Sequence, residues 1–298
     1  MDSISRPTDS VLLDEGSAVN AVLRLGQKTL GSSNDGHREA EILLSGLLGV
    51  DRVALYRDNI RIPGPLLAEY KTRLLRRASG EPVQYILGHV DFLGFRLRVG
   101  PGVLVPRPET ELWLSDLLGQ WPAATAEAPA RIMDLCTGSG CLALALSRRF
   151  PESQILAVDR SEEALTYARL NVRESGVSNV TLLCSDLFSG FPLGPWRADL
   201  LVCNPPYITE ADFSVLETTV RDWEPEEALR GGEDGLAYYR AVSARMGELL
   251  SPRGLVAFEV GAGQADAVSE ILRENGIRTV SVYRDLAGHD RAVFGARG

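Results

Sequence analysis

The chain has 298 residues, of which 45% are hydrophobic and 24% are charged, and its formal net charge is −9. This length can bury a large core in one or two domains, and the composition is that of a globular protein. No apolar run approaches the roughly 18 residues that span a bilayer, and the first residues lack the pattern of a secretory signal. We therefore expect a cytoplasmic protein with no membrane partner.

The charge is unevenly distributed along the chain. Residues 1–105 carry a net charge of +1, and residues 106–298 carry −10. Neither part has the basic footprint of a nucleic-acid-binding protein, so no direct nucleic-acid binding is expected. The four cysteines form no CxxC pair, and the three histidines are scattered. We expect buried free thiols and no metal site.

The N-terminal residues 1–85 show apolar side chains at helical spacing. The pattern predicts helices over residues 17–30 and around 40–48, and a third helix beginning at Gly64-Pro65, where proline is tolerated in the first turn. Glu69 and Arg73 stand four residues apart and can form an ion pair on that helix. Residues 1–85 are therefore predicted to be a small helical bundle, and nothing in them looks catalytic. We expect a unit without catalytic residues to serve in substrate docking.

The periodicity changes in the next segment, residues 86–105. Apolar and arginine side chains alternate from Phe95 to Val99, and Leu93-Gly94 can form a tight turn. This predicts a β-hairpin that connects two domains. Two prolines then stop the strand, and a helix is expected to start at Glu109 or Thr110 and to run through Leu118.

From Arg131 onward, predicted strands alternate with predicted helices. Such alternation indicates an α/β domain over residues 106–298, with a mostly parallel sheet of seven strands and helices on both faces. A loose loop is expected over residues 123–130. The predicted strands are 131–135, 155–158, 179–184, 198–203, 254–260, 278–283 and 291–295, and the predicted helices are 141–149, 161–175, 235–250 and 264–275.

A glycine-rich turn links the first of these strands to its helix. Residues 134–140 read Asp-Leu-Cys-Thr-Gly-Ser-Gly, and the next strand ends at Asp159. Glycines let the backbone approach a ligand closely, and an acid at the second strand end can accept hydrogen bonds from ribose hydroxyls. The pair predicts nucleoside binding. The alternative is an ordinary glycine turn and a solvated aspartate.

Three acids then distinguish between possible nucleosides. Asp134 would repel a pyrophosphate but could hold the ammonium of a methionyl group, and Asp186 suits an adenine amino group. With Asp159 they stand at three consecutive strand ends, which favours S-adenosylmethionine over a dinucleotide. Taken singly, each acid could equally be a surface or capping residue.

The fourth strand leads into Asn204-Pro205-Pro206-Tyr207. Proline cannot continue a central strand, so the chain leaves the sheet at Asn204. The Asn204 side-chain oxygen and the Pro205 carbonyl can accept both hydrogens of a planar amino group, and Tyr207 can stack on its plane. This arrangement would aim a weakly nucleophilic nitrogen at a methyl group without a prior general base.

These motifs leave more than one function open. The planar amino group could belong to a protein amide, or to adenine or cytosine in DNA or RNA. The acidic α/β domain counts against nucleic acid. A non-catalytic adapter is a third possibility, and the intact segment 204–207 argues against it.

The chain resembles the release-factor glutamine methyltransferases of the PrmC/HemK family over roughly residues 80–298. The Pro-Arg-Pro-Glu-Thr-Glu segment and the hairpin before it are the most family-specific features, whereas Asn-Pro-Pro-Tyr is shared with nucleic-acid amino methyltransferases. The matching segments are 80–82, 85–88, 106–111, the glycine turn, 204–207, 224–225, 228–229, 231–232, 234–235 and 290–291.

The resemblance implies a Rossmann-like methyltransferase domain that uses S-adenosylmethionine, with S-adenosylhomocysteine as product. The implied substrate is the glutamine of the Gly-Gly-Gln tip of bacterial class 1 peptide release factors. Asn204 is the implied catalytic residue, and Asn204, Pro205, Pro206 and Tyr207 would hold the glutamine. Besides Asp134, the residues implied to line the cofactor site are Cys136, Thr137, Gly138, Ser139, Gly140, Asp159, Asp186, Leu187 and Asn204.

Two residues depart from the family pattern. Cys136 stands where the family usually has glycine, so the turn must accept a side chain there. Leu187 stands where some members have an aromatic residue beside adenine. No feature of the sequence demands an oligomer, and a monomer is expected.

Overall fold

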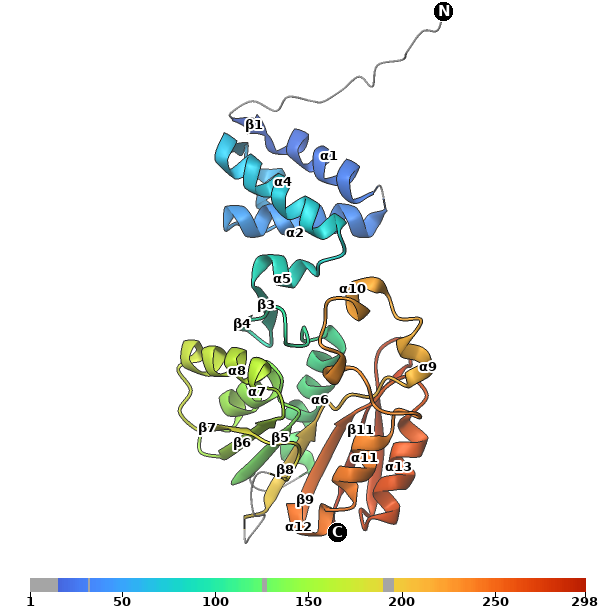
Figure 1. The fold of residues 1–298 in the computed structure, drawn as a ribbon. Helices are drawn as coiled ribbons and strands as arrows, with labels where there is room; N and C mark the ends of the chain where they lie inside the picture. The colour runs from blue at the N-terminus through green and yellow to red at the C-terminus, as the bar shows by residue number, and fades with distance from the viewer. Residues whose placement is uncertain (1–15, 32, 125–127, 190–195) are drawn as a thin grey trace, which may run out of the picture. The chain divides into compact units, whose positions relative to one another are not determined.

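The computed structural model describes residues 16–31, 33–124, 128–189 and 196–298 (Figure 1). The chain divides into two compact units, Met1–Leu87 and Gly88–Gly298. Each unit has its own hydrophobic core. Within the described ranges, no helix has both the length and the hydrophobicity to cross a membrane.

The first unit is a helical bundle with a short β-ladder. Its apolar stripes bury Val22, Leu43, Leu44 and Leu74 in one core, as helical spacing requires. The predicted Glu69–Arg73 ion pair forms, with 2.9 Å between Nε and Oε1. The elements are β1 Ser17–Ala18, α1 Val19–Leu30, α2 Asn34–Leu48, α3 Ala54–Arg57, β2 Arg61–Ile62, α4 Gly64–Ala78 and α5 Val83–Leu87.

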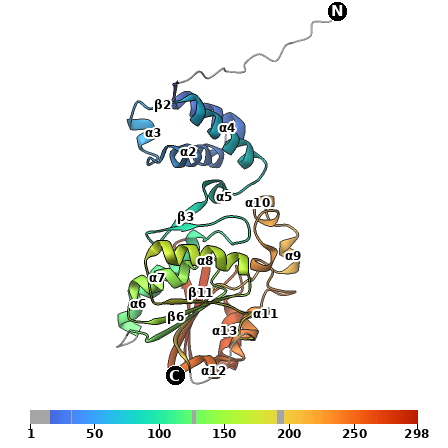
Figure 2. The same ribbon diagram turned by 60° about the vertical axis from the view of Figure 1, so that its left-hand side comes forward.

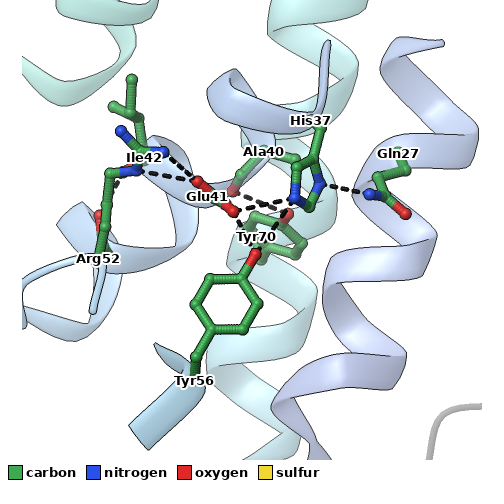
Figure 3. Close-up of polar contacts among 9 residues, drawn as sticks. Gln27, His37, Ala40, Glu41, Ile42, Arg52, Tyr56 and Tyr70 are labelled. Atoms are coloured by element: carbon green, nitrogen blue, oxygen red, sulfur yellow. Dashed lines mark hydrogen bonds and ion pairs between the residues drawn. The ribbon is translucent and has the colours of Figure 1, made fainter. Parts of the chain in front are cut away.

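A polar cluster of the bundle surrounds the buried side chain of Glu41, whose partners are partly exposed (Figure 3). The Glu41 side chain is only 6% exposed. It accepts hydrogen bonds from Tyr56 and from Arg52, whose Nε lies 2.9 Å from Oε2, and His37 Nε2 lies 3.0 Å from Oε1. Burial raises the pKa of Glu41, but the bonds from Tyr56 and Arg52 outweigh burial and the net pKa is lowered. The carboxylate therefore stays ionised and joins α2 to α3.

The second unit is built on a seven-stranded sheet of the described residues, in the order β10-β11-β9-β8-β5-β6-β7. The five strands from β9 to β7 are parallel, and β11 is antiparallel to both of its neighbours. This confirms the predicted α/β class with a mostly parallel sheet. The strands are β5 Arg131–Leu135, β6 Gln154–Asp159, β7 Val180–Cys184, β8 Ala198–Cys203, β9 Leu250–Glu259, β10 Thr279–Arg284 and β11 Asp290–Ala296.

Helices cover both faces of this sheet (Figure 2). Successive strand residues point to opposite faces, so Ile132 and Leu200 enter one core while Met133 and Leu201 enter the other. Long apolar strands are the consequence of burial on both faces. The first core is covered by α6 Pro108–Ala124, α7 Cys141–Arg149 and α8 Glu162–Ser175, and the second by α11 Ala237–Ser243, α12 Met246–Leu249 and α13 Ala265–Glu274.

The hairpin of strands β3 His89–Phe92 and β4 Phe95–Arg98 belongs to this second unit. Leu93 and Gly94 form its turn with φ of 42° and 75°, which is the conformation of a tight hairpin turn. Phe92, Phe95 and Leu97 enter the core beneath α6 and α7. The Asn171 side chain on α8 also bonds both the N–H and the C=O of Arg98.

Three predicted boundaries were wrong. The helix expected over 235–250 is interrupted at Arg245, whose φ of −107° and ψ of 6° lie outside the helical range. Strand β9 starts at Leu250, four residues before its predicted start. Helix α6 continues past Leu118 to Ala124 because Trp121 is buried against Phe150. The predicted loop 123–130 therefore begins inside a helix, and its residues 125–127 lie outside the described part.

Candidate active site

A cleft lies at the carboxyl ends of β5, β6, β7 and β8, where ligands bind in open α/β sheets. The space between its walls amounts to about 900 Å³, a figure that includes a part open to solvent. Several residues predicted from the sequence line it together. They are Cys136, Thr137, Gly138, Ser139, Asp159, Asp186, Leu187, Asn204 and Pro206.

The glycine turn forms the floor of this cleft. Gly138 and Gly140 have φ of 55° and 83°, a conformation that glycine adopts readily. The Gly138 N–H donates to Asp159 Oδ2 at 2.8 Å. Gly140 caps the start of α7 and does not line the cleft. Gly140 therefore affects the site only by setting the backbone path of the turn.

Asp134 lies beneath the turn and is completely buried. Its Oδ2 accepts hydrogen bonds from Thr137 Oγ1 at 2.6 Å and from the Ala143 N–H at 3.0 Å. Its Oδ1 has no partner among the described residues. Burial raises the pKa of Asp134 to about 7, and the nearby Asp159 adds to this rise. Asp134 thus joins the turn to α7 and does not line the cleft.

Asp159 faces the cleft from the end of β6. Its Oδ2 is bound by Gly138, and its Oδ1 accepts from the Ser161 N–H at 2.9 Å. Burial raises its pKa, while these backbone bonds lower it. The backbone bonds fix the carboxylate at the cleft wall, where its remaining lone pairs can accept hydrogen bonds from hydroxyl groups. Two acids beside the turn also disfavour a pyrophosphate.

Two non-glycine residues of the cleft have left-handed backbones. Cys136 and Leu187 have φ of 58° and 48°. The turn therefore accepts the Cys136 side chain in a conformation that favours glycine. Asp186 is exposed beside Leu187 at the far wall of the cleft.

A second cavity adjoins the first, and Asn204 lines both. The space between the walls of the second cavity amounts to about 560 Å³, including a part open to solvent, and these walls include Pro205, Tyr207 and Glu259. Asp159 and Asp186 therefore line the first cavity, whereas Tyr207 lines the second. Asn204 therefore lies in the wall between the two cavities.

The chain after Asn204 is held in place by later segments. Ile208 exchanges backbone hydrogen bonds with Leu229 and Gly231, at 2.9 and 2.8 Å. A Cβ on Gly231 would lie 2.7 Å from the Tyr207 Cα, so only glycine fits there without displacement. The Gln264 side chain donates to the Tyr207 carbonyl at 2.9 Å. The segment 204–207 is thus a fixed wall of both cavities.

Some residues of the two cavities were not identified from the sequence. Thr110 and Tyr238 line the first cavity, Glu259 lines the second, and Pro225 and Ala228 come from segments with no predicted role. Thr110 lies in the Pro-Arg-Pro-Glu-Thr-Glu segment and Glu259 ends a strand, so both had a signal. The region 208–236 carried only the family matches at 224–225, 228–229, 231–232 and 234–235, because its short helices lack a long periodic pattern.

The sheet and the cleft define the class of the protein. A family model described as "Methyltransferase small domain" matches residues 114–225. A solved methyltransferase from Pyrococcus furiosus aligns with a TM-score of 0.51 at 16% identity, covering 78% of this chain and 99% of that chain. The second unit is therefore a Rossmann-like methyltransferase domain.

The sequence relatives identify the family. A model described as "PrmC N-terminal domain" matches residues 21–88. A release factor glutamine methyltransferase from Thermodesulfovibrio yellowstonii is 38% identical, over 86% of this chain and 91% of its own length. One from Geobacter sulfurreducens is 40% identical, over 87% and 89%. The chain belongs to the release factor glutamine methyltransferase family of enzymes.

Proposed function

We propose that this enzyme transfers a methyl group from S-adenosylmethionine to the side-chain amide nitrogen of the glutamine in the Gly-Gly-Gln tip of class 1 peptide release factors. The observation that carries the proposal is the position of Asn204 in the wall of both cavities. One cavity would hold the donor and the other the glutamine. S-adenosylhomocysteine would be the second product.

The residues of the first cavity fit this cofactor. Asp159 would accept the ribose hydroxyls and Asp186 the adenine amino group, beside Leu187. Asp134, which the sequence suggested for the methionyl ammonium, does not line this cavity, so it would instead support the turn through its bonds with Thr137 and Ala143. Cys136, Thr137, Gly138, Ser139 and Gly140 would form the turn against which the cofactor lies. When bound, S-adenosylmethionine supplies a sulfonium-activated methyl group.

The second cavity would orient the glutamine. Asn204 Oδ1 and the Pro205 carbonyl would accept the two amide hydrogens, Tyr207 would lie against the amide plane, and Pro206 would keep the segment rigid. An amide nitrogen is a poor nucleophile, so its placement must supply most of the rate. Orientation is worth up to roughly 7–11 kcal/mol, against about 1 kcal/mol for each neutral hydrogen bond.

The division of labour along the chain is also part of the proposal. Residues 1–85 would dock the body of the release factor, and residues 106–298 would catalyse the reaction. Residues 86–105 would connect these two parts. Val53, Tyr56 and Leu75 of the first unit are more than half exposed and give it apolar surface for a partner. The enzyme would act as a monomer in the cytoplasm, where translation factors are found.

Transfer of a labelled methyl group to a panel of acceptors tests the function. The panel contains a whole class 1 release factor, the same factor with its tip glutamine replaced, a tip peptide, and adenine- and cytosine-containing oligonucleotides. We expect label on the whole factor, none on the glutamine variant, and a higher KM for the peptide because it lacks the docking contacts. Label on the oligonucleotides alone would establish the nucleic-acid alternative instead.

A further inference from the structure

We propose that Thr110 and Glu259 act as positioning residues that fix which way the Asn204 side-chain amide faces. The inference rests on the methyl transfer proposed above and extends it to two residues that would act on the reaction through Asn204. The three residues come from the first turn of α6, the end of β9 and the end of β8.

A chain of three polar contacts links them. Asn204 Nδ2 lies 3.4 Å from Thr110 Oγ1, a long hydrogen bond of the kind that tightens when a substrate binds. Thr110 Oγ1 donates to Glu259 Oε2 at 2.6 Å. The same Oε2 accepts from Trp113 Nε1 at 2.7 Å.

The position of the Thr110 hydroxyl proton decides which groups donate and which accept in these contacts. A hydroxyl has a single proton, and an ionised carboxylate can only accept, so the short contact assigns the Thr110 proton to Glu259, whose Oε2 also accepts from the Trp113 indole N–H. Thr110 Oγ1 then presents only lone pairs to Asn204. The Asn204 amide must therefore turn its NH₂ group toward Thr110.

This orientation points Asn204 Oδ1 away from Thr110, at the opposite edge of the amide group from Nδ2. Only the oxygen can accept a hydrogen from a glutamine NH₂ group. The reverse orientation would place two donor groups opposite each other and two acceptors at Thr110. An Asn204 amide in the reverse orientation would thus accept no hydrogen from the glutamine. The glutamine nitrogen, which is the nucleophile, would be misplaced.

The chain of contacts is also shielded from water. Thr110, Trp113 and Glu259 are 1%, 0% and 3% exposed, so no solvent molecule competes for their hydrogen bonds. The Tyr239 hydroxyl donates to the Glu259 carbonyl at 2.8 Å and fixes the backbone at that point. A buried polar chain of this kind specifies one arrangement of its members.

Variants of Thr110 test the proposal by steady-state kinetics with a whole release factor. Thr110→Val keeps the shape and removes the hydroxyl, and we expect kcat to fall by about 10- to 100-fold with little change in the KM for S-adenosylmethionine. Thr110→Ser restores the hydroxyl and should recover most of the lost rate. Thr166→Val removes a comparable hydroxyl from the exposed face of α8 and serves as the matched control.

Variants of Glu259 separate positioning from direct chemistry. Glu259→Gln keeps an oxygen that can accept from Thr110 and Trp113, so most of the rate should remain. Glu259→Leu removes the acceptor and should match the loss of Thr110→Val. Calorimetric binding of S-adenosylmethionine establishes that each variant is folded at the site.

Two results would overturn the inference. One is a Thr110→Val enzyme with kcat within twofold of wild type. The other is a Glu259→Gln enzyme as inactive as Glu259→Leu, because that result would give the carboxylate charge a direct role. A wild-type enzyme that labels no release factor would instead reject the proposed function, so the two failures are distinguishable.

Discussion

Cys136 and Leu187 combine two properties that rarely occur together: both line the cleft, and both have a left-handed backbone. A side chain in that conformation costs roughly 1–2 kcal/mol. Such strain concentrates at functional sites, where the surrounding structure holds it. The glycine turn above the buried Asp134 is such a surrounding, because Thr137 and Ala143 both bond that carboxylate.

Substitutions at Cys136 measure this strain. Cys136→Gly should unfold with a free energy about 1 kcal/mol higher than Cys136→Ala, because only glycine adopts the left-handed backbone without cost. Ala267→Gly in α13 is the control and should show the opposite sign, since glycine destabilises a helix interior by about 1 kcal/mol. Urea unfolding provides the values. An alanine variant as stable as the glycine variant would show that the backbone at residue 136 is not strained.

At the level of single residues, the sequence predicted the positions of the acids but not all of their contacts. The strand ends located Asp159 and Asp186 in the cleft, because strand ends follow from hydrophobic runs and prolines. Asp134 was expected to face a ligand, yet it is buried beneath the turn. The partnership of Thr110 with Glu259 joins residues 149 positions apart, and periodicity contains no information on such pairs.

At the level of elements, the N-terminal bundle depends on an ionised carboxylate inside it. Glu41 joins α2 to α3 through Tyr56 and Arg52 (Figure 3). Its pKa is lowered in the folded chain. The stabilisation is therefore fully present above the unfolded pKa of about 4.3 and is lost as the pH falls through the folded value.

Glu41→Gln tests the contribution of this cluster. The variant should lose about 1–3 kcal/mol of unfolding free energy at pH 7, the typical value of hydrogen bonds to a charged group, and the difference from wild type should shrink at acid pH. Circular dichroism reports both units. Tryptophan fluorescence reports only the second unit, because all four tryptophans lie between residues 113 and 223, and it should not change. A constant difference from pH 7 to pH 3 would contradict the assignment.

The sequence predicted the elements of the sheet better than their ends. Alternating strands and helices established the α/β class and located every strand of the described sheet. The predicted boundaries were wrong where tertiary packing determines the end of an element. Burial of Trp121 extends α6 to Ala124, and the early start of β9 follows from its pairing of Leu250 with Ala198 on β8. Neither partner can be identified from local spacing.

At the level of the whole molecule, the chain joins a helical unit to a methyltransferase domain of known family. The motifs of the second unit were recognisable because each occupies a strand end of a common sheet. In the second cavity, the segment 204–207 was recognisable in the same way, whereas the lining residues from 220–229 were not assigned a role, since they belong to short segments without periodicity. That cavity is the part of the site that would select glutamine over a base.

The most direct test of the central claim is tandem mass spectrometry of a release factor after incubation with the enzyme and S-adenosylmethionine. We expect one methyl group on the side chain of the Gly-Gly-Gln glutamine. A folded Asn204→Ala enzyme should yield about 100-fold less of this product, because the amide is no longer oriented. A methyl group on any other residue, or normal methylation by Asn204→Ala, would contradict the account.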